Sequence, residues 1–413
     1  MTSQTLGIVA DDLTGAMDSS GYFVSMGFST VVILEPGFYS AADVVVITTN
    51  SRAEDPNTAR ERVKQAVRSL AGRVVCKKID STLRGNVGVE LEATMDELTC
   101  EKAIVAPAFP AVGRTTMAGR LLVNGVSVAE TQFADDPISP VKESHIPSLL
   151  EQSTQRQVGC VTIADINAGP EPLFRKLSVM PQEIVVCDVT EQSHLTGIVR
   201  AAALAEGRWL LCGSGGLARE LLFLLPKVPR ASKAIHSSLP SGPALVVVGT
   251  RNQVVANQLL KARDEIGLPI LNLPVEHLNG ENTLSGKVGG MLEAADRLLG
   301  QEKGLVLSSV FSRYLPALRQ SMAAFMAEAA TGILARRKFA GLFLSGGDIA
   351  VEVCRGLQVS AIQVHGEVEP GVPAGELIGG PYEGMRVVTK AGGFGTERVL
   401  VKSIAYLERG NLP

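Results

Sequence analysis

Short apolar runs alternate with amphipathic segments through the first half of the chain. The runs are rich in Val, Ile, Leu and Cys, as strands buried on both faces of a sheet are. Segments between them, such as Asn57–Leu70, place apolar residues on one helical face. This alternation predicts a mostly parallel sheet with helices on both sides. The expected strands are Leu6–Ala10, Thr30–Leu34, Val44–Thr48, Val74–Lys78, Ala103–Ala106, Cys160–Ile163, Ile184–Cys187 and Trp209–Cys212, and Asn124-Gly125 reads as a hairpin turn.

A stretch without periodicity, residues 226–242, is rich in Pro and Ser and is typical of a linker. The alternation then restarts, so we predict two α/β domains, residues 1–230 and 243–413, each with a mostly parallel sheet flanked by helices. The second set of expected elements comprises strands Ala244–Val248, Gly304–Ser308, Gly341–Leu344 and Met385–Thr389, and helices Asn252–Ile266, Leu315–Arg337, Ile349–Leu357 and Glu397–Arg409.

Composition narrows the class of protein. Of 413 residues, 46% are hydrophobic and 20% charged, as in globular proteins with substantial cores. The net charge of -3, without a basic block, argues against a nucleic-acid partner. The six cysteines are dispersed without a CxxC pair, which predicts reduced structural thiols. No apolar run approaches the ~20 residues of a membrane span, so we expect a cytoplasmic protein without a membrane partner.

Two carboxylates, Asp11 and Asp12, directly follow the first expected strand. Ligands of open parallel sheets bind beyond the carboxyl ends of the strands, so these acids are expected to face a site. Successive residues of an extended segment point to opposite sides, so only one of the two should meet a substrate. Either could serve as a general base, and the sequence does not choose between them.

Two further polar clusters, Thr49–Arg52 and Lys77–Asn86, follow other strands. Together they predict a pocket for a polyhydroxylated anion, with Asp80 as another hydroxyl acceptor. Arg52, Lys78 or Arg84 could pair a carboxylate, the arginines with a bidentate fork. The alternative is that Ser81 or Thr82 caps a helix and the charges are solvated.

Three glycine turns in the second half each lie between a strand and a helix, at residues 248–251, 344–348 and 389–396. Such turns present backbone N–H groups, and three on one sheet would converge on a phosphate-bearing ligand. Lys390 could reach phosphate oxygens or could point into solvent. Neither a Walker A loop nor a GxGxxG fingerprint occurs, so a dinucleotide site is not supported. A fourth turn, residues 211–218, fits an anion site or a packing or closure role.

These motifs resemble those of the four-carbon acid sugar kinases over nearly the whole chain. The N-terminal substrate domain of that family is matched by ADDLTGA (10–16), TNSR (49–52), KKIDSTLRGN (77–86), PAFPAVGRTT (107–116) and VNG (123–125). Its nucleotide-binding domain is matched by GTRNQV (249–254), LSGGD (344–348), GEVEPGVPAG (366–375) and TKAGGFG (389–395).

The resemblance implies ATP-dependent phosphorylation of the terminal hydroxyl of a four-carbon sugar acid, with Mg²⁺, in a cleft between the two domains. The segment KIDSTLRG is closer to the D-threonate branch than to the 3-oxo-tetronate branch, and D-erythronate is a further alternative. Asp12 or Asp11 would be the catalytic base. The implied and inferred contacts are Asp11, Arg52, Lys78, Ile79, Asp80, Ser81 and Arg84 for the acid, and Thr250, Gly346, Gly347, Asp348, Lys390, Gly392 and Gly393 for ATP.

Two other functional classes remain as alternatives, a non-catalytic sugar-acid sensor and a Rossmann-type oxidoreductase. The missing dinucleotide fingerprint disfavours the oxidoreductase. The sequence does not identify which residues would hold the metal, and it leaves a homodimer open.

Overall fold

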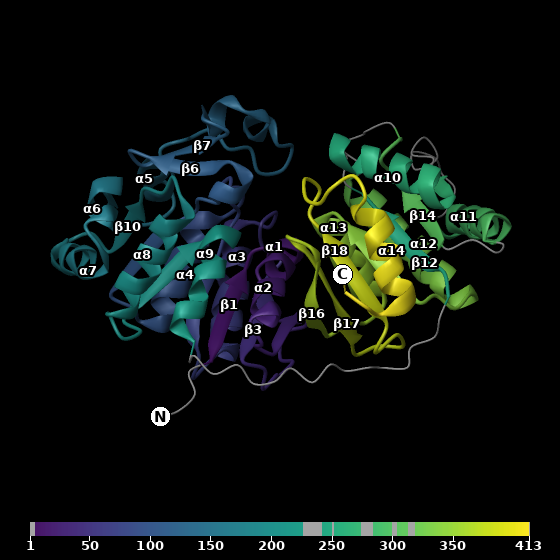
Figure 1. Ribbon diagram of the computed structural model, residues 1–413, viewed down its shortest axis with the longest axis horizontal. Coiled ribbons are helices and arrows are strands. Elements are labelled where there is room, and N and C mark those ends of the chain that lie inside the picture. Colours follow the sequence, from purple (N-terminus) through teal and green to yellow (C-terminus); the bar gives the residue numbers. More distant parts are fainter. Residues whose placement is uncertain are drawn as a thin grey trace. The chain divides into compact units, whose positions relative to one another are not determined.

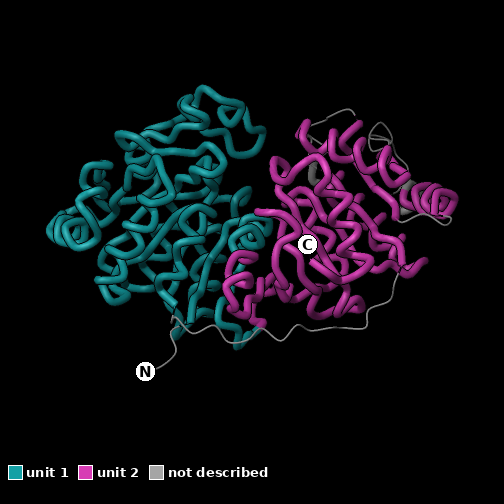
Figure 2. Tube along the Cα trace, in the orientation of Figure 1, with its two compact units in different colours: residues 1–19, 39–230 teal, residues 20–38, 231–413 magenta. Residues whose placement is uncertain are grey.

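The computed structural model describes residues 5–225, 242–249, 252–273, 284–299, 304–312 and 319–412. The chain forms two compact units, coloured separately in Figure 2. Unit 1 comprises residues 1–19 and 39–230, and unit 2 comprises residues 20–38 and 231–413. The domains expected from the sequence, residues 1–230 and 243–413, placed residues 20–38 in the first domain, whereas the structure groups them with unit 2. Of the expected linker, 226–242, all but Gly242 lies outside the described residues.

A parallel sheet of buried strands forms the centre of unit 1 (Figure 1). The strand order is β3-β1-β4-β11-β5-β10-β9, and all neighbours pair in parallel. The carboxyl ends of three strands are level, because Ala10 pairs with both Thr48 and Lys78. The strands are β1 (Leu6–Ala10), β3 (Val44–Thr48), β4 (Val74–Lys78), β5 (Lys102–Ala106), β9 (Val158–Val161), β10 (Ile184–Cys187) and β11 (Trp209–Gly213).

Helices cover both faces of this sheet, and a small antiparallel sheet lies above it in Figure 1. The small sheet contains β6 (Arg114–Met117), β7 (Arg120–Val123) and β8 (Val126–Ser127). Asn124 and Gly125 join β7 to β8 with φ of 50° and 81°, so the expected hairpin turn is confirmed. The helices are α1 (Leu13–Asp18), α3 (Pro56–Ser69), α4 (Val87–Leu98), α5 (Ile146–Glu151), α6 (Ile163–Asn167), α7 (Pro170–Val179), α8 (Gln192–Ala203) and α9 (Gly215–Glu220).

Unit 2 has a mixed sheet in the order β13-β14-β12-β15-β18-β17-β16-β2. The first five strands are parallel, and the remaining pairings are antiparallel. The strands are β2 (Thr30–Ile33), β12 (Ala244–Val248), β13 (Ile270–Asn272), β14 (Gly304–Ser308), β15 (Gly341–Ser345), β16 (Ala361–Glu369), β17 (Val372–Ile378) and β18 (Arg386–Lys390). The helices are α2 (Gly21–Ser25), α10 (Gln253–Ile266), α11 (Leu284–Leu298), α12 (Arg319–Arg336), α13 (Gly347–Gly356) and α14 (Val399–Arg409).

Backbone pairing explains why residues 20–38 belong to unit 2. Strand β2 is antiparallel to β16, with Thr30 opposite Val364 and Ile33 opposite Ala361. Next to it, Glu367 of β16 packs against Gly21 of α2, where a Cβ would lie 2.4 Å from the Glu367 Cγ. An apolar strand is thus buried by a partner that comes from the other end of the chain.

The predicted α/β class with mostly parallel, helix-flanked sheets is confirmed. One strand was placed too late: β9 ends at Val161, because Asp165 accepts the N–H of Thr162 and α6 begins at Ile163. The antiparallel pair β16 and β17 was not predicted. Part of the expected helix Leu315–Arg337, residues 315–318, lies outside the described chain.

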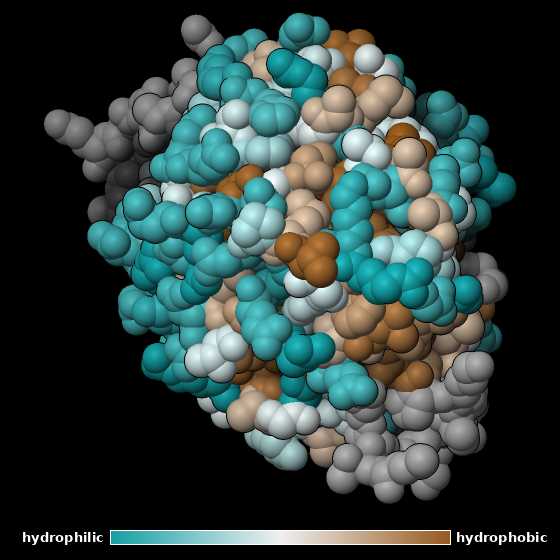
Figure 3. Space-filling model, turned by 90° about the vertical axis from the view of Figure 1, so that its left-hand side faces the viewer, coloured by the Kyte–Doolittle hydropathy of each residue, from teal (hydrophilic) through white to brown (hydrophobic). Residues whose placement is uncertain are grey.

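The surface and the cysteines match what the composition predicts for a globular protein with reduced thiols. On the face in Figure 3, hydrophilic residues predominate and apolar ones form separate groups. Within the described ranges, no helix is both long enough and apolar enough to cross a bilayer. All six cysteines are free.

Candidate functional site

Asp11, Asp12 and Arg52 form a charged cluster at the carboxyl end of β1. The Arg52 guanidinium donates to Asp11 from Nε (2.8 Å to Oδ2) and Nη2 (2.9 Å to Oδ1). It also donates to Asp12 from Nη1 (2.9 Å to Oδ2) and Nη2 (2.8 Å to Oδ1). The exposed fraction of the side chain is 4% for Asp11 and 16% for Asp12. Asp12 is therefore the more accessible of the two carboxylates.

The local sequence fixes the Asp12 carboxylate. Asp12 is the N-cap of α1: its Oδ1 accepts the Gly15 N–H (2.8 Å) and its Oδ2 accepts the Thr14 hydroxyl (2.6 Å). Glycine at position 15 leaves room for both groups, because a Cβ there would lie 2.5 Å from Asp12 Oδ1 and 3.0 Å from Lys78 Nζ. The segment Asp-Leu-Thr-Gly thus lets a carboxylate and an ammonium approach one helix start.

Electrostatics keep the cluster ionised. Burial acts to raise the pKa of Asp11, but the charge and hydrogen bonds of Arg52, with Lys77 and Lys78 adding to them, lower that pKa overall. Burial would lower the pKa of Arg52, but Asp11 and Asp12 raise it well above its usual value. These pKa shifts favour an ionised Asp11 carboxylate beside a charged Arg52 guanidinium.

Asp80 and Arg84 form a second pair beside the first. Arg84 donates to Asp80 from Nε (2.9 Å) and Nη2 (3.1 Å), and its Nη1 lies 3.3 Å from Asp136. Burial would raise the pKa of Asp80, but Arg84 and Arg52 hold it well below its usual value. That Arg52 or Arg84 pairs a substrate carboxylate with its fork stays a prediction. Both forks already bind aspartates of the chain.

Lys78 is the expected cation with donors to spare. Its buried ammonium at the end of β4 donates to the Ile79 carbonyl (3.1 Å). Within the described residues, no carboxylate lies close enough to form an ion pair with it. An ammonium carries three donors, so Lys78 can still bind an anion.

Ile79 and Ser81 differ in what they can offer a ligand. The Ile79 side chain is apolar and lies in the core of unit 1. The backbone N–H of Ile79 donates to the Gly213 carbonyl (2.9 Å), so it is already paired. The Ser81 hydroxyl is half-buried and has no hydrogen-bond partner in the described part of the chain. It is free to donate to a hydroxylated ligand.

A buried ion pair beneath the cluster was not predicted. Lys77 Nζ lies 2.7 Å from Glu90 Oε2, and both side chains are buried. Glu90 Oε1 accepts the Ser51 hydroxyl (2.7 Å), and the Ser51 N–H donates to the Asp11 carbonyl (3.0 Å). The pair therefore braces the loop that carries Arg52. The available signal was a lysine inside a buried strand, which requires a buried acid.

Arg114 was likewise missed as a candidate, although its loop was noted. Its Nη1 donates to the Val112 carbonyl, and its guanidinium lies 5.9 Å from the Phe133 ring centroid. Its Nε is buried without a hydrogen-bond partner in the described structure. Burial lowers the pKa of Arg114, and Asp80 and Arg84 are the charges that act on it. It is a second cation near the acid cluster.

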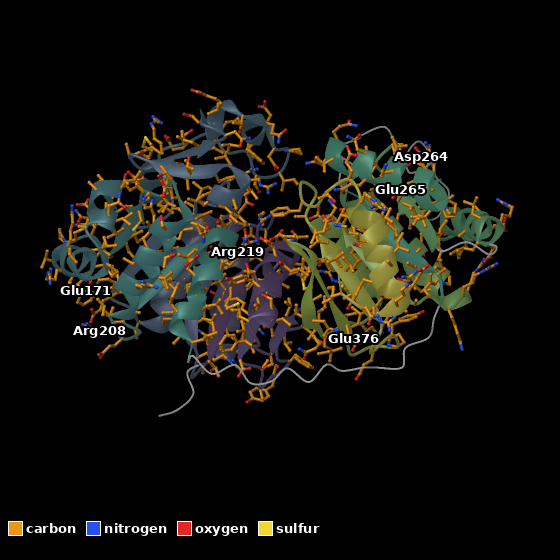
Figure 4. All side chains as sticks on the ribbon, viewed as in Figure 1. Glu171, Arg208, Arg219, Asp264, Glu265 and Glu376 are labelled. Atoms are coloured by element: carbon orange, nitrogen blue, oxygen red, sulfur yellow. The ribbon has the colours of Figure 1, made fainter. Side chains whose placement is uncertain are left out.

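The turn at residues 211–218 packs tightly in unit 1. A Cβ on Gly213 would lie 2.4 Å from the Ala106 carbonyl oxygen, and one on Gly216 would lie 2.6 Å from that of Ala108. Arg219 of α9, labelled in Figure 4, has its guanidinium 5.3 Å from the centroid of the Phe109 ring. These contacts support the packing role.

Two of the three glycine turns in unit 2 are described in full, and they start from adjacent strands with level ends. Val248 of β12 pairs with Ser345 of β15, which pairs with Lys390 of β18. The first turn is described only to Gly249, so the expected ATP contact Thr250 lies outside the described residues. The turns at Gly346 and at residues 391–396 therefore leave the same edge of one sheet.

Gly346 starts α13 with a φ of 107°, a conformation that favours glycine. Its N–H donates to the Lys390 carbonyl (3.3 Å), which joins the second turn to the third. Gly347 and Asp348 form the first turn of α13, and the Asp348 side chain is exposed.

Lys390 requires a correction. The alternative that its ammonium points into solvent is wrong, because the residue is 1% exposed, whereas its contact with ATP stays a prediction. It donates to the carbonyls of Ala391 (3.1 Å), Gly392 (3.0 Å) and Phe394 (3.1 Å). A lysine so enclosed fixes the shape of a glycine loop.

The fold and these two sites define a two-domain α/β enzyme. Family models agree: a sugar-binding N-terminal domain matches residues 6–221, and a nucleotide-binding C-terminal domain matches residues 245–400. The chain belongs to the four-carbon acid sugar kinase family. As a member, it is a phosphotransferase with an alcohol group as acceptor.

Several curated relatives are similar over nearly their whole length. A D-threonate kinase of Bordetella bronchiseptica is 33% identical over 96% of this chain and 96% of its own. A D-threonate kinase of Salmonella typhimurium is 30% identical, covering 97% and 98%. A D-erythronate kinase of Heliobacterium modesticaldum is also 30% identical, covering 97% and 96%.

Solved structures show the same fold. A Salmonella typhimurium protein described as a putative tRNA synthase superposes with a TM-score of 0.79 at 24% identity, covering 97% of this chain and 98% of its own. A Haemophilus influenzae protein gives a TM-score of 0.72 at 23% identity, covering 97% and 100%.

Proposed function

We propose that this kinase transfers the γ-phosphoryl group of ATP to the terminal (4-) hydroxyl of D-threonate. The observation that carries the proposal is the accessible Asp12 carboxylate, held by Arg52 and by the start of α1 and lying near the ammonium of Lys78. Relatives named D-threonate kinase at 30% and 33% identity support the choice of substrate. D-erythronate and 3-oxo-tetronate are the alternatives, since relatives of similar identity carry those names.

In this proposal Lys78 binds the substrate carboxylate, with Arg114 as a second cation, and Asp12 accepts the hydroxyl proton. Asp12 already receives hydrogen bonds from Thr14, Gly15 and both terminal nitrogens of Arg52. A carboxylate has about four lone-pair sites, so an incoming hydroxyl must replace one donor. The Thr14 hydroxyl can rotate away, and it is the donor that gives way.

Catalysis of this kind depends on positioning and on electrostatic stabilisation of the transferred group. The turns at residues 346–348 and 391–396 would bind ATP through backbone N–H groups. Mg²⁺ bound with ATP would neutralise phosphate charge. It is commonly held by one or two carboxylates and the phosphates themselves, and the exposed Asp348 fits that role. That the two ligands meet in a cleft between the domains stays a prediction.

The test is an ADP-release assay over D-threonate, D-erythronate and their oxo forms, followed by NMR of the product. We expect the highest kcat/KM with D-threonate and a phosphate on the terminal carbon. Higher kcat/KM with D-erythronate or an oxo acid would replace the proposed substrate with that alternative. Binding of these acids without turnover of any of them would favour the alternative of a non-catalytic sugar-acid sensor.

A further inference from the structure

Most carbonyl groups of the loop at residues 391–396 accept hydrogen bonds from buried side chains. Lys390 Nζ donates to those of Ala391, Gly392 and Phe394 at 3.0–3.1 Å. Three protons on one ammonium meet three carbonyl oxygens, which satisfies the group fully. The loop is thus wrapped around a single buried cation.

Gln258 of α10 binds the second half of the same loop. Its Nε2 lies 3.1 Å from the carbonyls of Phe394 and Gly395 and 3.0 Å from that of Thr396. Gln258 is 2% exposed. Helix α10 is fastened near its end by Glu265, labelled in Figure 4, which lies 3.0 Å from Arg398. The amide therefore comes from a fixed element.

Glu369 closes the loop on its far side. Its Oε2 accepts the Thr396 N–H (2.7 Å) and its Oε1 accepts the Thr396 hydroxyl (2.7 Å). Lys402 of α14 lies 2.7 Å from the same carboxylate. Side chains from β16, β18 and α10 thus determine this one loop.

The inward carbonyls determine where the amides point. All peptide bonds of the described chain are trans, so each carbonyl is opposed to the N–H of the next residue. The N–H groups of Gly392, Gly393 and Gly395 are therefore turned outward. No described residue accepts a hydrogen bond from them, and Gly393 is exposed. The amides of Gly392 and Gly393 are successive, and such a pair can form a concave site for an anion, whereas the Phe394 N–H donates to the Ala391 carbonyl (3.2 Å).

We propose that Lys390 and Gln258 are positioning residues that hold the loop in its phosphate-binding conformation, and that the charge of Lys390 controls the affinity for ATP. This inference rests on the proposed function in taking the loop as part of the ATP site. The two side chains act through the backbone, and neither contacts the nucleotide.

Charge control gives a pH dependence with a defined sign. Burial lowers the pKa of Lys390 to about 8. The charged form donates to three carbonyls, so the loop is ordered below that pH and loosens as pH rises through it. The titratable groups on the surrounding elements are Glu369, its partner Lys402 and the exposed Asp348. Phosphate groups lose their second proton near pH 6, so ATP itself is constant over this range.

The experiment measures the Kd of a non-hydrolysable ATP analogue with the full-length protein from pH 7 to 9.5 by calorimetry. We expect the wild-type Kd to rise through about pH 8. Lys390→Met should weaken binding about 10- to 100-fold at pH 7, because it removes hydrogen bonds made by a charged group. The same variant should abolish the pH dependence of the Kd. Lys390→Arg should keep the charge and remove the rise in Kd near pH 8. Gln258→Leu should weaken binding without changing the pH dependence.

Lys338→Met is the control, because Lys338 is an exposed lysine just before the other end of β15. The Kd for D-threonate, measured in parallel, shows whether each variant is folded. An unchanged analogue Kd and pH dependence in Lys390→Met would overturn the proposal, as would wild-type protein that binds no analogue. If Lys390→Met does not fold, an unchanged Kd in Gln258→Leu overturns it equally. Analogue binding without turnover on any acid would contradict only the proposed function.

Discussion

Two neighbouring aspartates share one arginine but differ in access to ligand. Asp11 and Asp12 both bind Arg52, but the exposed fraction of the side chain is 4% for Asp11 and 16% for Asp12. Both side chains converge on one guanidinium, so the expected alternation to opposite sides does not hold at this strand end. Asp11 is thus suited to orient Arg52, and Asp12 is suited to take a proton.

Asp12→Asn should therefore abolish turnover while preserving the fold. Asparagine caps helices about as well as aspartate, but it cannot accept a proton. We expect kcat to fall on the order of 10²- to 10⁴-fold, the range of general base catalysis, with a small change in the melting temperature. Asp55→Asn is the control, because Asp55 caps α3 in the same way and is exposed. A kcat for Asp12→Asn within a few-fold of wild type would exclude Asp12 as the base.

Glu90→Ala should destabilise the protein more than any surface charge change. It leaves the Lys77 ammonium buried without its partner, which typically costs about 3–5 kcal/mol. Urea unfolding measures the loss. Glu97→Ala is the matched control, since Glu97 pairs with the exposed Arg68 and little change is expected. Equal losses of unfolding free energy in the two variants would show that the buried ion pair stabilises the protein no more than a surface pair does.

The sequence brought the candidate acid-site residues together because they directly follow strands whose carboxyl ends are level. It could not reveal that the forks of Arg52 and Arg84 are taken by aspartates, since that depends on which side chains face one another. Lys390 shows the same limit. Its position before a glycine turn suggested phosphate contact, but the three-dimensional path of residues 391–394 encloses its ammonium.

At the scale of elements, parallel strands were easier to foresee than antiparallel ones. Continuous apolar runs such as Ala244–Val248 appear at the same bounds in the structure. The strands β16 and β17 were not predicted, because Gly and Pro interrupt them and because their buried positions only partly alternate. Helix starts depended on single caps, as at Thr162.

Two glycines of unit 1 should respond oppositely to alanine. Gly125 has a φ of +81° and no heavy atom within 4 Å of the place a Cβ would take, so Gly125→Ala meets only backbone strain, about 1–2 kcal/mol. Gly197 lies within α8, where a Cβ would be 3.7 Å from its nearest neighbour, so Gly197→Ala should stabilise by about 0.5–1 kcal/mol. Urea unfolding measures both. Changes of the same sign would contradict this account.

At the scale of the whole molecule, the division into units is not a division of the chain into two halves. A fragment of residues 1–225 contains β2 without β16. We expect this fragment to aggregate and to bind a dye for exposed apolar surface, because Val31, Val32 and Ile33 lose their cover. Co-expression of residues 242–413 should restore solubility. A monomeric, cooperatively folding fragment would show that β2 does not need its partner.

A homodimer of the full chain stays a prediction that sedimentation can check.

The pairing of β2 with β16 also has a consequence for synthesis on the ribosome. Residues 30–33 emerge early, whereas β16 begins at Ala361. At about 5–20 residues per second, the apolar strand waits roughly 15 to 65 s for its partner. The nascent chain must carry this aggregation-prone segment without β16 through most of its own translation, so we expect its yield in cells to depend on chaperones that shield that segment.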